Sequence, residues 1–353
     1  MFAWVTLGAL AGCSPARTGH DAETHTPLVR FVGRVDTSDP SAARFAWSGS
    51  GFAARFDGTS LAVRMGGGQE YTVLVDGVVG PKFVPSGGGF ALVAHGLPSG
   101  VHEVQVYRRT EAHLGESSLL GVDVGDGQLL APSPAPARRL EVVGDSISCG
   151  YGNEGADQTC GFTPQTENHY QSYGALVARA LGAELVTVGW SGKGVVCNYG
   201  DAPDSCTDPM PTYYDRTLPQ RPQSRWDFSR WQPHAVVVNL GTNDFSTEVD
   251  PTPAEFEAAY VALLGRIRAA YADAVIFCTI GPMLFGEDLE TARGAIARAV
   301  HARIAAGDAA VKVFELAPTN PAHGYGCDWH PSVRTHQVMA DTLTAVLRAE
   351  LGW

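Results

Sequence analysis

Residues 140–152 read LEVVGDSISCGYG, an apolar run that passes directly into Gly144, Asp145 and Ser146. This pattern is typical of a strand that is buried on both faces and ends in a loop. Similar apolar runs follow at 184–188, 235–240, 274–277 and 311–314. Segments with Ala, Leu and Arg at helical spacing lie between or after them, at 168–182, 253–270, 288–306 and 332–350. The alternation predicts a three-layer, flavodoxin-like α/β domain over residues 138–353, with a parallel sheet of about five strands.

The residues before this domain follow a different pattern. From residue 28 to 130, short segments alternate apolar and polar side chains, as in VHEVQVY at 101–107. Turn signals separate them, namely Asp-Gly pairs at 57–58 and 76–77 and glycine triplets at 66–68 and 87–89. About nine strands with turns between them predict an all-β sandwich of the jelly-roll type. The proline-rich string APSPAPA at 131–137 then predicts a stiff linker.

Polar strings follow several strands of the predicted parallel sheet. Ser146 follows the first strand, and GWSGKG at 189–194 follows the second. GTND at 241–244 follows the third, and CDWHP at 327–331 follows the last. Because the carboxyl ends of parallel strands meet at one edge of a sheet, these strings are expected to lie close together.

The residue types in these strings fit acyl transfer. A serine hydroxyl becomes a nucleophile when a neutral imidazole takes its proton, and the imidazole needs an acceptor on its other nitrogen. The oxyanion that then forms needs preorganised donors. A glycine N–H that can approach closely and an asparagine amide are such donors. The sequence therefore predicts a serine hydrolase site without a metal or another cofactor.

The strings Gly144-Asp145-Ser146, Gly192, Gly241–Asp244 and His330-Pro331 resemble the four blocks of the SGNH, or GDSL, hydrolases. The preceding β-sandwich and the strings GDSISCGYG, WSGKG and DWHP are most similar to carbohydrate esterase family 2. The absence of a G-x-S-x-G string from the sequence disfavours an ordinary α/β-hydrolase.

The resemblance implies a role for each of the matching residues. Ser146 is the implied nucleophile and His330 the implied base. The Ser146 and Gly192 N–H groups and the Asn243 side chain are the implied oxyanion donors. Gly194 is the second choice for the glycine donor, if Gly192 faces away.

The acid of the triad departs from the superfamily pattern. The position three residues before His330 is Cys327, and Asp328 is the nearest carboxylate. We expect Asp328 to orient the imidazole, as the family resemblance implies. The alternatives are that a backbone carbonyl orients His330, as in some family members, and that Asp328 is a structural ion-pair or capping residue.

Aromatic and acidic residues near the strings have competing interpretations. Trp329 is either a platform for a sugar ring, which the resemblance favours, or part of the core. Three further aromatic residues are candidates for the same cleft: Trp190, Tyr213 and Tyr214. Asp145 and Asp244 are expected to bind loop backbone rather than form a catalytic carboxylate pair.

Composition excludes some classes of function. The chain has 353 residues, with 25 Lys and Arg against 37 Asp and Glu, which gives a net charge of −12. A nucleic-acid partner is not expected, because binding to phosphates needs a surplus of basic residues. The sequence has no apolar run of the length that a membrane-spanning helix requires.

The amino terminus and the cysteines point to export. Residues 1–13 resemble a bacterial lipoprotein signal in which Cys13 would carry the lipid, although no basic residue precedes Arg17. Residues 14–27 would form a polar tether. We therefore expect a secreted protein or a cell-surface lipoprotein, anchored at the outer membrane or released outside the cell.

Six further cysteines favour disulfides over zinc, because no C-x-x-C spacing occurs in the sequence. Fifteen pairings are possible. The shortest separations suggest Cys149 with Cys160 and Cys197 with Cys206. Cys278 would then pair with Cys327.

The leading hypothesis from the sequence is a monomeric serine esterase that removes O-acetyl groups from polysaccharides such as xylan, mannan or glucomannan. A lipase or thioesterase of the same superfamily, acting on longer acyl esters, is the first alternative. A non-catalytic glycan-binding surface protein is the second.

Overall fold

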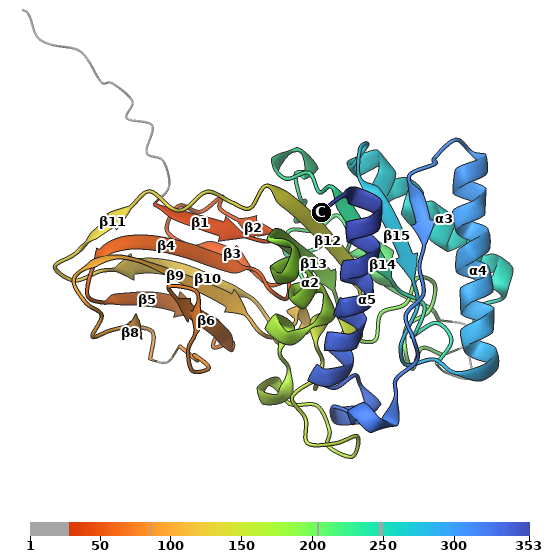
Figure 1. Ribbon diagram of the computed structural model, residues 1–353, viewed down its shortest axis with the longest axis horizontal. Helices are drawn as coiled ribbons and strands as arrows, with labels where there is room; N and C mark the ends of the chain where they lie inside the picture. Colours follow the sequence, from red (N-terminus) through yellow and green to blue (C-terminus); the bar gives the residue numbers. More distant parts are fainter. Residues whose placement is uncertain (1–27, 86, 203–204, 247–249) are drawn as a thin grey trace, which may run out of the picture.

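The computed structural model describes residues 28–85, 87–202, 205–246 and 250–353. An all-β domain, red to yellow in Figure 1, lies beside a domain of alternating strands and helices, green to blue. Cys13 and the segments 1–13 and 14–27, for which the sequence suggests a signal and a tether, lie outside the described residues.

Two antiparallel sheets form the all-β domain. The first has the order β1-β4-β9-β6-β7, with β11 paired to β4. Its strands are β1 (Val29–Val32), β4 (Gly51–Gly58), β9 (Gly100–Arg108), β6 (Tyr71–Val75), β7 (Val78–Val79) and β11 (Gln128–Leu130). The second has the order β2-β3-β10-β5-β8. Its strands are β2 (Val35–Asp36), β3 (Ala43–Phe45), β10 (Ser117–Asp123), β5 (Leu61–Gly66) and β8 (Phe90–Ala94).

Buried and outward-facing side chains alternate along these strands, and the buried ones form the core between the two sheets. In β5, Leu61, Val63 and Met65 are buried, whereas Ala62 and Arg64 face outward. Since successive side chains of a strand point to opposite faces, one apolar face per strand is enough to close a sandwich. The sandwich expected from the sequence is confirmed, with eleven strands in the described residues rather than about nine.

Five parallel strands in the order β13-β12-β14-β15-β16 form the sheet of the second domain. Their bounds are β12 (Arg138–Gly144), β13 (Ala183–Gly189), β14 (Ala235–Asn239), β15 (Val275–Thr279) and β16 (Val311–Val313). Counted from β12, the strand order is 2-1-3-4-5, which is the flavodoxin-like order. The expected fold class is therefore confirmed.

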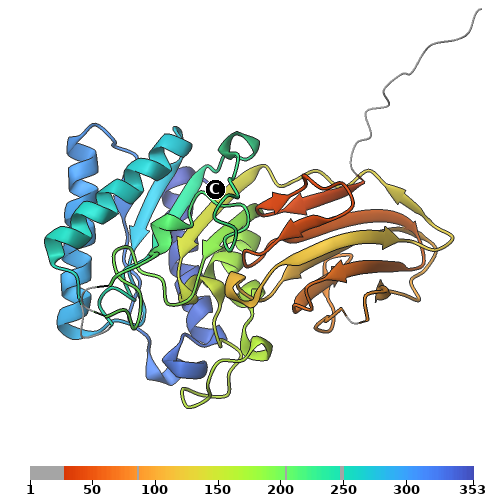
Figure 2. The same cartoon turned by 180° about the vertical axis from the view of Figure 1, so that it is seen from behind.

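Helices cover both faces of this sheet, as Figures 1 and 2 show from its two sides. Helices α2 (Tyr173–Leu181) and α5 (Val333–Leu351) pack on one face. Helices α3 (Pro253–Ala270) and α4 (Gly286–Ala305) pack on the other. Helix α2 begins at Tyr173 rather than at the expected residue 168, because the backbone of Ser172, directly before it, is extended. Among the described residues, no helix has the length and apolarity that crossing a membrane requires.

Short 3-10 helices lie in the loops around these elements. They are η1 (Ala112–Leu114), η2 (Pro164–Thr166), η3 (His169–Gln171), η4 (Met210–Thr212), η5 (Phe228–Arg230), η6 (Pro321–His323) and η7 (Cys327–Trp329).

A buried ion pair joins the two domains. Arg34, which follows β1, lies 3.1 Å from Glu141 of β12, and both side chains are fully buried. Two tyrosine hydroxyls also donate to the Glu141 carboxylate, Tyr214 at 2.9 Å and Tyr271 at 2.8 Å. Tyr214 is therefore part of the interior, and the expectation that it lines a substrate cleft is wrong.

The disulfides differ in part from the expected pairing. Cys197 pairs with Cys206 as expected. The other two expected pairs are wrong, because Cys160 pairs with Cys327, 167 positions away in sequence. Cys149 and Cys278 are free thiols, both buried in the α/β domain. Short sequence separation identified the local pair only.

Candidate active site

The chain turns where β12 ends, and the turn places Ser146 at the start of a helix. Helix α1 (Ser146–Cys149) is capped by the Asp145 carboxylate, which accepts a hydrogen bond from the Ile147 amide at 3.0 Å. Gly144 is needed at the turn, since a Cβ atom there would lie 2.0 Å from Ser148 Oγ. As the first residue of the helix, Ser146 keeps an amide N–H that no carbonyl of that helix can accept.

The imidazole of His330 lies against this serine. His330 Nε2 is 2.9 Å from Ser146 Oγ, although the two residues are 184 positions apart. His330 follows η7, and its ring stacks on that of Tyr151 with the centroids 4.1 Å apart. The structure thus brings together the two residues that the sequence predicts as nucleophile and base.

The other imidazole nitrogen faces backbone rather than a carboxylate. His330 Nδ1 lies 3.1 Å from the carbonyl oxygen of Asp328 and 3.2 Å from that of Cys327. The Asp328 carboxylate accepts instead from the Tyr151 hydroxyl at 2.8 Å and from the Phe162 amide at 3.0 Å. The expectation that the Asp328 side chain orients His330 is therefore wrong, and the backbone-carbonyl alternative describes the site.

Backbone conformation explains where the Asp328 side chain points. Asp328 and Trp329 have φ angles of +51° and +62°, in the left-handed region that non-glycine residues seldom adopt. The surroundings hold this turn in place, because Cys327 is disulfide-bonded to Cys160 and the Asp328 amide donates to the Cys160 carbonyl at 2.9 Å. Asp328 thus acts as an anchor for the loop that carries His330.

Burial sets the charge state of the imidazole. It lowers the pKa of His330 below the ordinary value of 6.5, while the carbonyls of Asp328 and Cys327 oppose this effect. A neutral ring that donates from Nδ1 to a carbonyl leaves Nε2 as an acceptor. This is the tautomer that can take a proton from Ser146.

The implied donors Gly192 and Asn243 follow β13 and β14, the two strands that flank β12, at the carboxyl edge of the sheet. Gly192 has a φ of +77°, which favours glycine, and its carbonyl accepts from the Tyr199 amide at 2.8 Å. Asn243 Nδ2 donates to the Lys193 carbonyl at 3.0 Å and lies 3.4 Å from Asp145 Oδ2. Gly192 and Asn243 are thus parts of one connected cluster with the residue that caps the serine helix.

Gly194 fits the role of donor less well than Gly192. Its N–H points to Asn198 Oδ1 at 3.3 Å, and its carbonyl accepts from the Met210 amide at 2.8 Å. A donor that already has an internal partner must release it to bind an oxyanion, and this holds also for Asn243 Nδ2, which contacts the Lys193 carbonyl and Asp145. Gly192 therefore remains the first choice.

Asp145 and Asp244 bind backbone, as expected. Asp244 accepts from the amides of Val195 at 2.8 Å, Val196 at 2.7 Å and Cys197 at 3.0 Å, which fixes the loop after Gly192. Burial raises the pKa of Asp145 to about 7 and that of Asp244 to about 6. Both carboxyl groups shape the loops around the site.

The aromatic candidates have different environments. Trp329 is 59% exposed beside His330 and packs edge-on against Tyr325, with the ring centroids 5.2 Å apart. That exposure excludes the interpretation of Trp329 as part of the core. Trp190 and Tyr213 are half-buried and contact each other, with centroids 4.9 Å apart. A platform role for Trp329 stays a prediction.

Sequence reasoning missed three residues that build the site. Tyr151 and Phe162 hold Asp328, and Glu111 comes from the β-sandwich domain to contact Ser191, the residue before Gly192. Tyr151 lies in the GDSISCGYG string, so its position in the sequence could have indicated that it belongs to the site. The sequence contained no signal for Glu111, because this residue lies in the connection between β9 and β10 of a different domain.

One group of potential metal ligands occurs among the described residues. Ligand atoms of Glu111, Cys149 and Glu167 lie within 4.8 Å of one another, and all three residues are buried. Both Glu111 oxygens accept from Ser191, and Glu167 Oε2 accepts from the Glu111 amide. The carboxylates are thus used in internal contacts that join the two domains.

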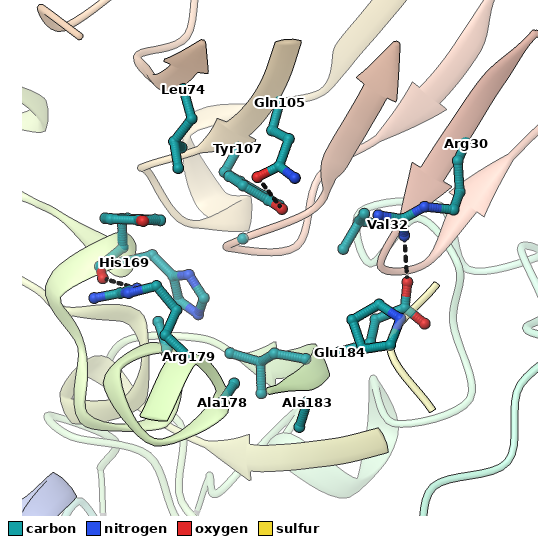
Figure 3. A pocket seen from close by; sticks show the side chains of 15 residues that line it. Arg30, Val32, Leu74, Gln105, Tyr107, His169, Ala178, Arg179, Ala183 and Glu184 are labelled. Carbon is teal, nitrogen blue, oxygen red and sulfur yellow. Dashed lines mark hydrogen bonds and ion pairs between the residues drawn. The ribbon is translucent and has the colours of Figure 1, made fainter. Parts of the chain in front are cut away.

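A cavity of about 160 Å³ between the two domains is separate from the candidate site. Figure 3 shows its lining, which includes Tyr107 and an ion pair between Arg30 and Glu184. None of the predicted site residues lines it. The chemistry of the strand-end residues, and not this cavity, therefore locates the candidate site.

Comparisons with known families and proteins agree with this arrangement. The carbohydrate esterase 2 N-terminal family matches residues 31–134, and the GDSL-like Lipase/Acylhydrolase family matches residues 142–338. The cellulase/esterase CelE of Acetivibrio thermocellus is 42% identical over 344 residues. That match covers 96% of this chain and 41% of CelE, so the chain spans less than half of that relative. An acetylxylan esterase / glucomannan deacetylase of Cellvibrio japonicus is 27% identical, and the match covers 94% of this chain and 93% of the relative.

Solved structures extend the similarity to the whole fold. A family two carbohydrate esterase from Clostridium thermocellum, in complex with cellohexaose, is 42% identical with a TM-score of 0.87. The match covers 92% of this chain and 99% of that structure. A family two carbohydrate esterase from Cellvibrio japonicus is 26% identical with a TM-score of 0.82, and the match covers 93% and 96%. The chain described here therefore belongs to carbohydrate esterase family 2.

Proposed function

We propose that the protein is a serine esterase that removes O-acetyl groups from polysaccharides, with Ser146 as nucleophile and His330 as base. The distance of 2.9 Å between Ser146 Oγ and His330 Nε2, at the carboxyl edge of the parallel sheet, is the observation that carries this proposal. Membership of a carbohydrate esterase family supports the reaction class.

The reaction runs in two steps. Ser146 Oγ attacks the acetyl carbonyl carbon while its proton moves to His330 Nε2. The oxyanion is held by the N–H groups of Ser146 and Gly192 and by Asn243. The C–O bond to the sugar then breaks, and the sugar oxygen takes the proton from His330. In the second step water attacks the acetyl-enzyme while His330 takes its proton, the bond between Ser146 Oγ and the acetyl carbon breaks, Ser146 Oγ takes the proton back from His330, and acetate leaves.

Acetylated xylan and glucomannan are the proposed substrates. The relative from Cellvibrio japonicus is named an acetylxylan esterase / glucomannan deacetylase, and the exposed Trp329 ring offers a stacking surface beside the base. Purified protein should release acetate from both polysaccharides and from 4-nitrophenyl acetate, and Ser146→Ala should lose at least about a thousandfold in kcat. If wild-type protein released no acetate from any of the three, the proposal would fail.

Acyl length separates the proposed activity from that of a lipase or thioesterase. The strings that carry Ser146, Gly192 and His330 contain glycine, aromatic and polar residues and no long aliphatic side chain other than Ile147, and this composition favours a short acyl group. We expect kcat/KM for 4-nitrophenyl acetate to exceed that for the octanoate ester. A preference for octanoate would point to the longer-chain alternative.

Glycan binding without turnover is a second candidate, because a relative of 42% identity is known in complex with cellohexaose. Titration of Ser146→Ala with cellohexaose measures such binding directly. Competitive inhibition of 4-nitrophenyl acetate hydrolysis would place the glucan at the catalytic site. Saturable binding by a wild-type protein that lacks esterase activity would favour this candidate.

We also propose an exported monomer that is lipidated at Cys13. The two disulfides, Cys160–Cys327 and Cys197–Cys206, support an oxidising compartment. Labelled palmitate should enter the wild-type protein and not Cys13→Ala when each is expressed in a bacterial host. Light scattering of the purified protein tests the monomeric state.

A further inference from the structure

A loop of the β-sandwich domain reaches the catalytic edge of the α/β domain. It joins β9 to β10 and contains η1. The Arg109 guanidinium pairs with Glu154, and the Arg109 carbonyl accepts from the His169 amide at 3.0 Å. These contacts hold the loop against the α/β domain and bury Glu111 completely.

The Glu111 carboxylate holds the residue that precedes the implied oxyanion donor. Its Oε2 accepts from the Ser191 amide at 2.7 Å, and its Oε1 accepts from the Ser191 hydroxyl. Ser191 lies directly before Gly192. On the other side, Asn243 binds the Lys193 carbonyl at 3.0 Å. The turn that presents the Gly192 N–H is thus held at both ends.

Glu111 is itself fixed by its surroundings. Its amide donates to Glu167 Oε2 at 3.1 Å, and its carbonyl accepts from the Arg108 guanidinium at 2.7 Å. His113 Nδ1 lies 3.3 Å from Glu111 Oε2. Burial, together with the nearby Glu111, raises the pKa of Glu167 well above its ordinary range.

The charge and the geometry of Glu111 have opposite effects on catalysis. A carboxylate near the site disfavours a second negative charge on the substrate oxygen. Two fixed hydrogen bonds to Ser191 favour that oxyanion by holding the adjacent N–H in place before the reaction. Removal of the charge alone therefore raises the rate if electrostatics dominates and lowers it if positioning dominates.

We propose that Glu111, supplied by the β-sandwich domain, is a positioning residue for the Ser191–Gly192 turn of the esterase site. This inference rests on the proposed function, because it assigns a reason for the Gly192 N–H to be held. It also gives the β-sandwich a role in the reaction, since the α/β domain alone lacks the acceptor for Ser191.

The test compares kcat and KM of the full chain and its Glu111→Gln variant on 4-nitrophenyl acetate. The substitution keeps the size of the side chain and removes one of the two acceptor oxygens. Since loss of an oxyanion donor costs about a hundred- to a thousandfold, misplacement of one is expected to lower kcat about ten- to a hundredfold, with KM within about threefold. An unchanged or higher kcat overturns the proposal.

A tetrahedral inhibitor separates positioning from general destabilisation. Methylboronic acid adds to Ser146 Oγ, which loses its proton to His330, and forms a tetrahedral anion that uses the oxyanion donors. We expect its affinity for Glu111→Gln to fall in parallel with kcat/KM. A lower thermal midpoint with unchanged inhibitor affinity would show a structural role only and overturn the inference.

Glu116→Gln is the matched control, because Glu116 lies in the same loop and also crosses the domain junction. Its carboxylate binds Arg221 with two contacts of 2.6 Å and has no contact with Ser191. Kinetic constants of Glu116→Gln should stay within about twofold of wild type. An equal loss of kcat in both variants would assign the effect to the junction and not to Glu111.

Ser191→Ala completes the design and does not depend on the folding of the glutamate variant. It removes the hydroxyl donor and should lower kcat about three- to tenfold, with little change in KM. Its effect in the Glu111→Gln background should be smaller than in wild type, because both changes break the same contact. Folded Ser191→Ala with wild-type kcat, or full additivity, overturns the inference. A wild-type protein without esterase activity would instead refute the proposed function.

Discussion

The Asp328 carboxylate binds Tyr151 and the Phe162 amide, so substitutions of Asp328 act on the loop rather than on the proton transfer. Asn at this position keeps an acceptor oxygen and tolerates the left-handed backbone. We therefore predict that Asp328→Asn keeps kcat within about threefold of wild type, whereas the same change in a true triad acid costs about ten-thousandfold.

Asp328→Ala loses the acceptor and places alanine at a φ of +51°. It should therefore lower kcat about tenfold and also reduce the thermal midpoint, as the anchor of the loop is lost. Steady-state kinetics and thermal melts of the two variants check both statements. A loss of several orders of magnitude in folded Asp328→Asn would restore the carboxylate to a triad.

The charge state of His330 predicts the acid limb of the pH–rate profile. Only the neutral ring can accept the Ser146 proton, so kcat/KM falls as the pH drops through the pKa of His330 in the free enzyme. Burial lowers that pKa, and this effect exceeds the opposing effects of the Asp328 and Cys327 carbonyls and of the Asp328 and Glu111 charges. The midpoint of the acid limb should therefore lie below 6.5, measured on an uncharged ester. A midpoint above 6.5 would contradict the predicted environment.

Local motifs made Ser146 and His330 predictable from the sequence. The residues that orient this pair were not predictable in the same way. Ser146 and His330 each stand in a short string at a predictable strand end or loop. The direction of the Asp328 side chain depends on φ angles of two non-glycine residues, which residue identity does not reveal. Glu111 enters the site from another domain, so no spacing within the hydrolase strings could indicate it.

At the scale of elements, one disulfide fastens the loop that carries His330. Cys160–Cys327 closes a separation of 167 residues, while Cys197–Cys206 closes one of 9. The chain-entropy argument gives about 5 kcal/mol for the long loop and about 2.6 kcal/mol for the short one. We predict that Cys160→Ser lowers the free energy of unfolding more than Cys206→Ser does.

Denaturant unfolding of the two variants measures this ranking. Cys160→Ser should also lower kcat, because the Cys327 and Cys160 carbonyls bind the His330 ring and the Asp328 amide. Equal losses of stability, or a larger loss for Cys206→Ser, would show that the long bridge does not constrain the unfolded chain as expected.

The spacing of apolar residues predicted the strands and helices better than the loops and disulfides that connect them. Apolar runs identified all five parallel strands to within a few residues, because strands buried on both faces carry continuous apolar runs. The helix predicted over 168–182 also included the 3-10 helix His169–Gln171, which the extended Ser172 separates from α2. The Cys160 pairing depends on how two distant loops meet, which separation along the chain does not encode.

The whole molecule depends on its domain junction, where Arg34 and Glu141 are both fully buried. Loss of one partner leaves a buried charge without compensation, which typically costs about 3–5 kcal/mol. Arg30 and Glu184 form a second pair across the junction, with 18% and 9% of their side-chain surfaces exposed. This pair (Figure 3) is less buried than Arg34–Glu141, so its loss is expected to cost less than the loss of Arg34 or Glu141.

These two ion pairs predict different losses of stability when their arginines are removed. Arg34→Ala leaves the Glu141 carboxylate buried with only the hydroxyls of Tyr214 and Tyr271 as donors, and should lower the free energy of unfolding by about 3–5 kcal/mol. Arg30→Ala is the matched control, because it removes an arginine from the same junction where the ion pair is less completely buried. If the junction couples the domains, wild-type protein unfolds in one transition. Arg34→Ala should then separate the unfolding of the β-sandwich from that of the α/β domain in calorimetry. Equal effects of the two substitutions would mean that burial of the Arg34–Glu141 pair does not stabilise the junction.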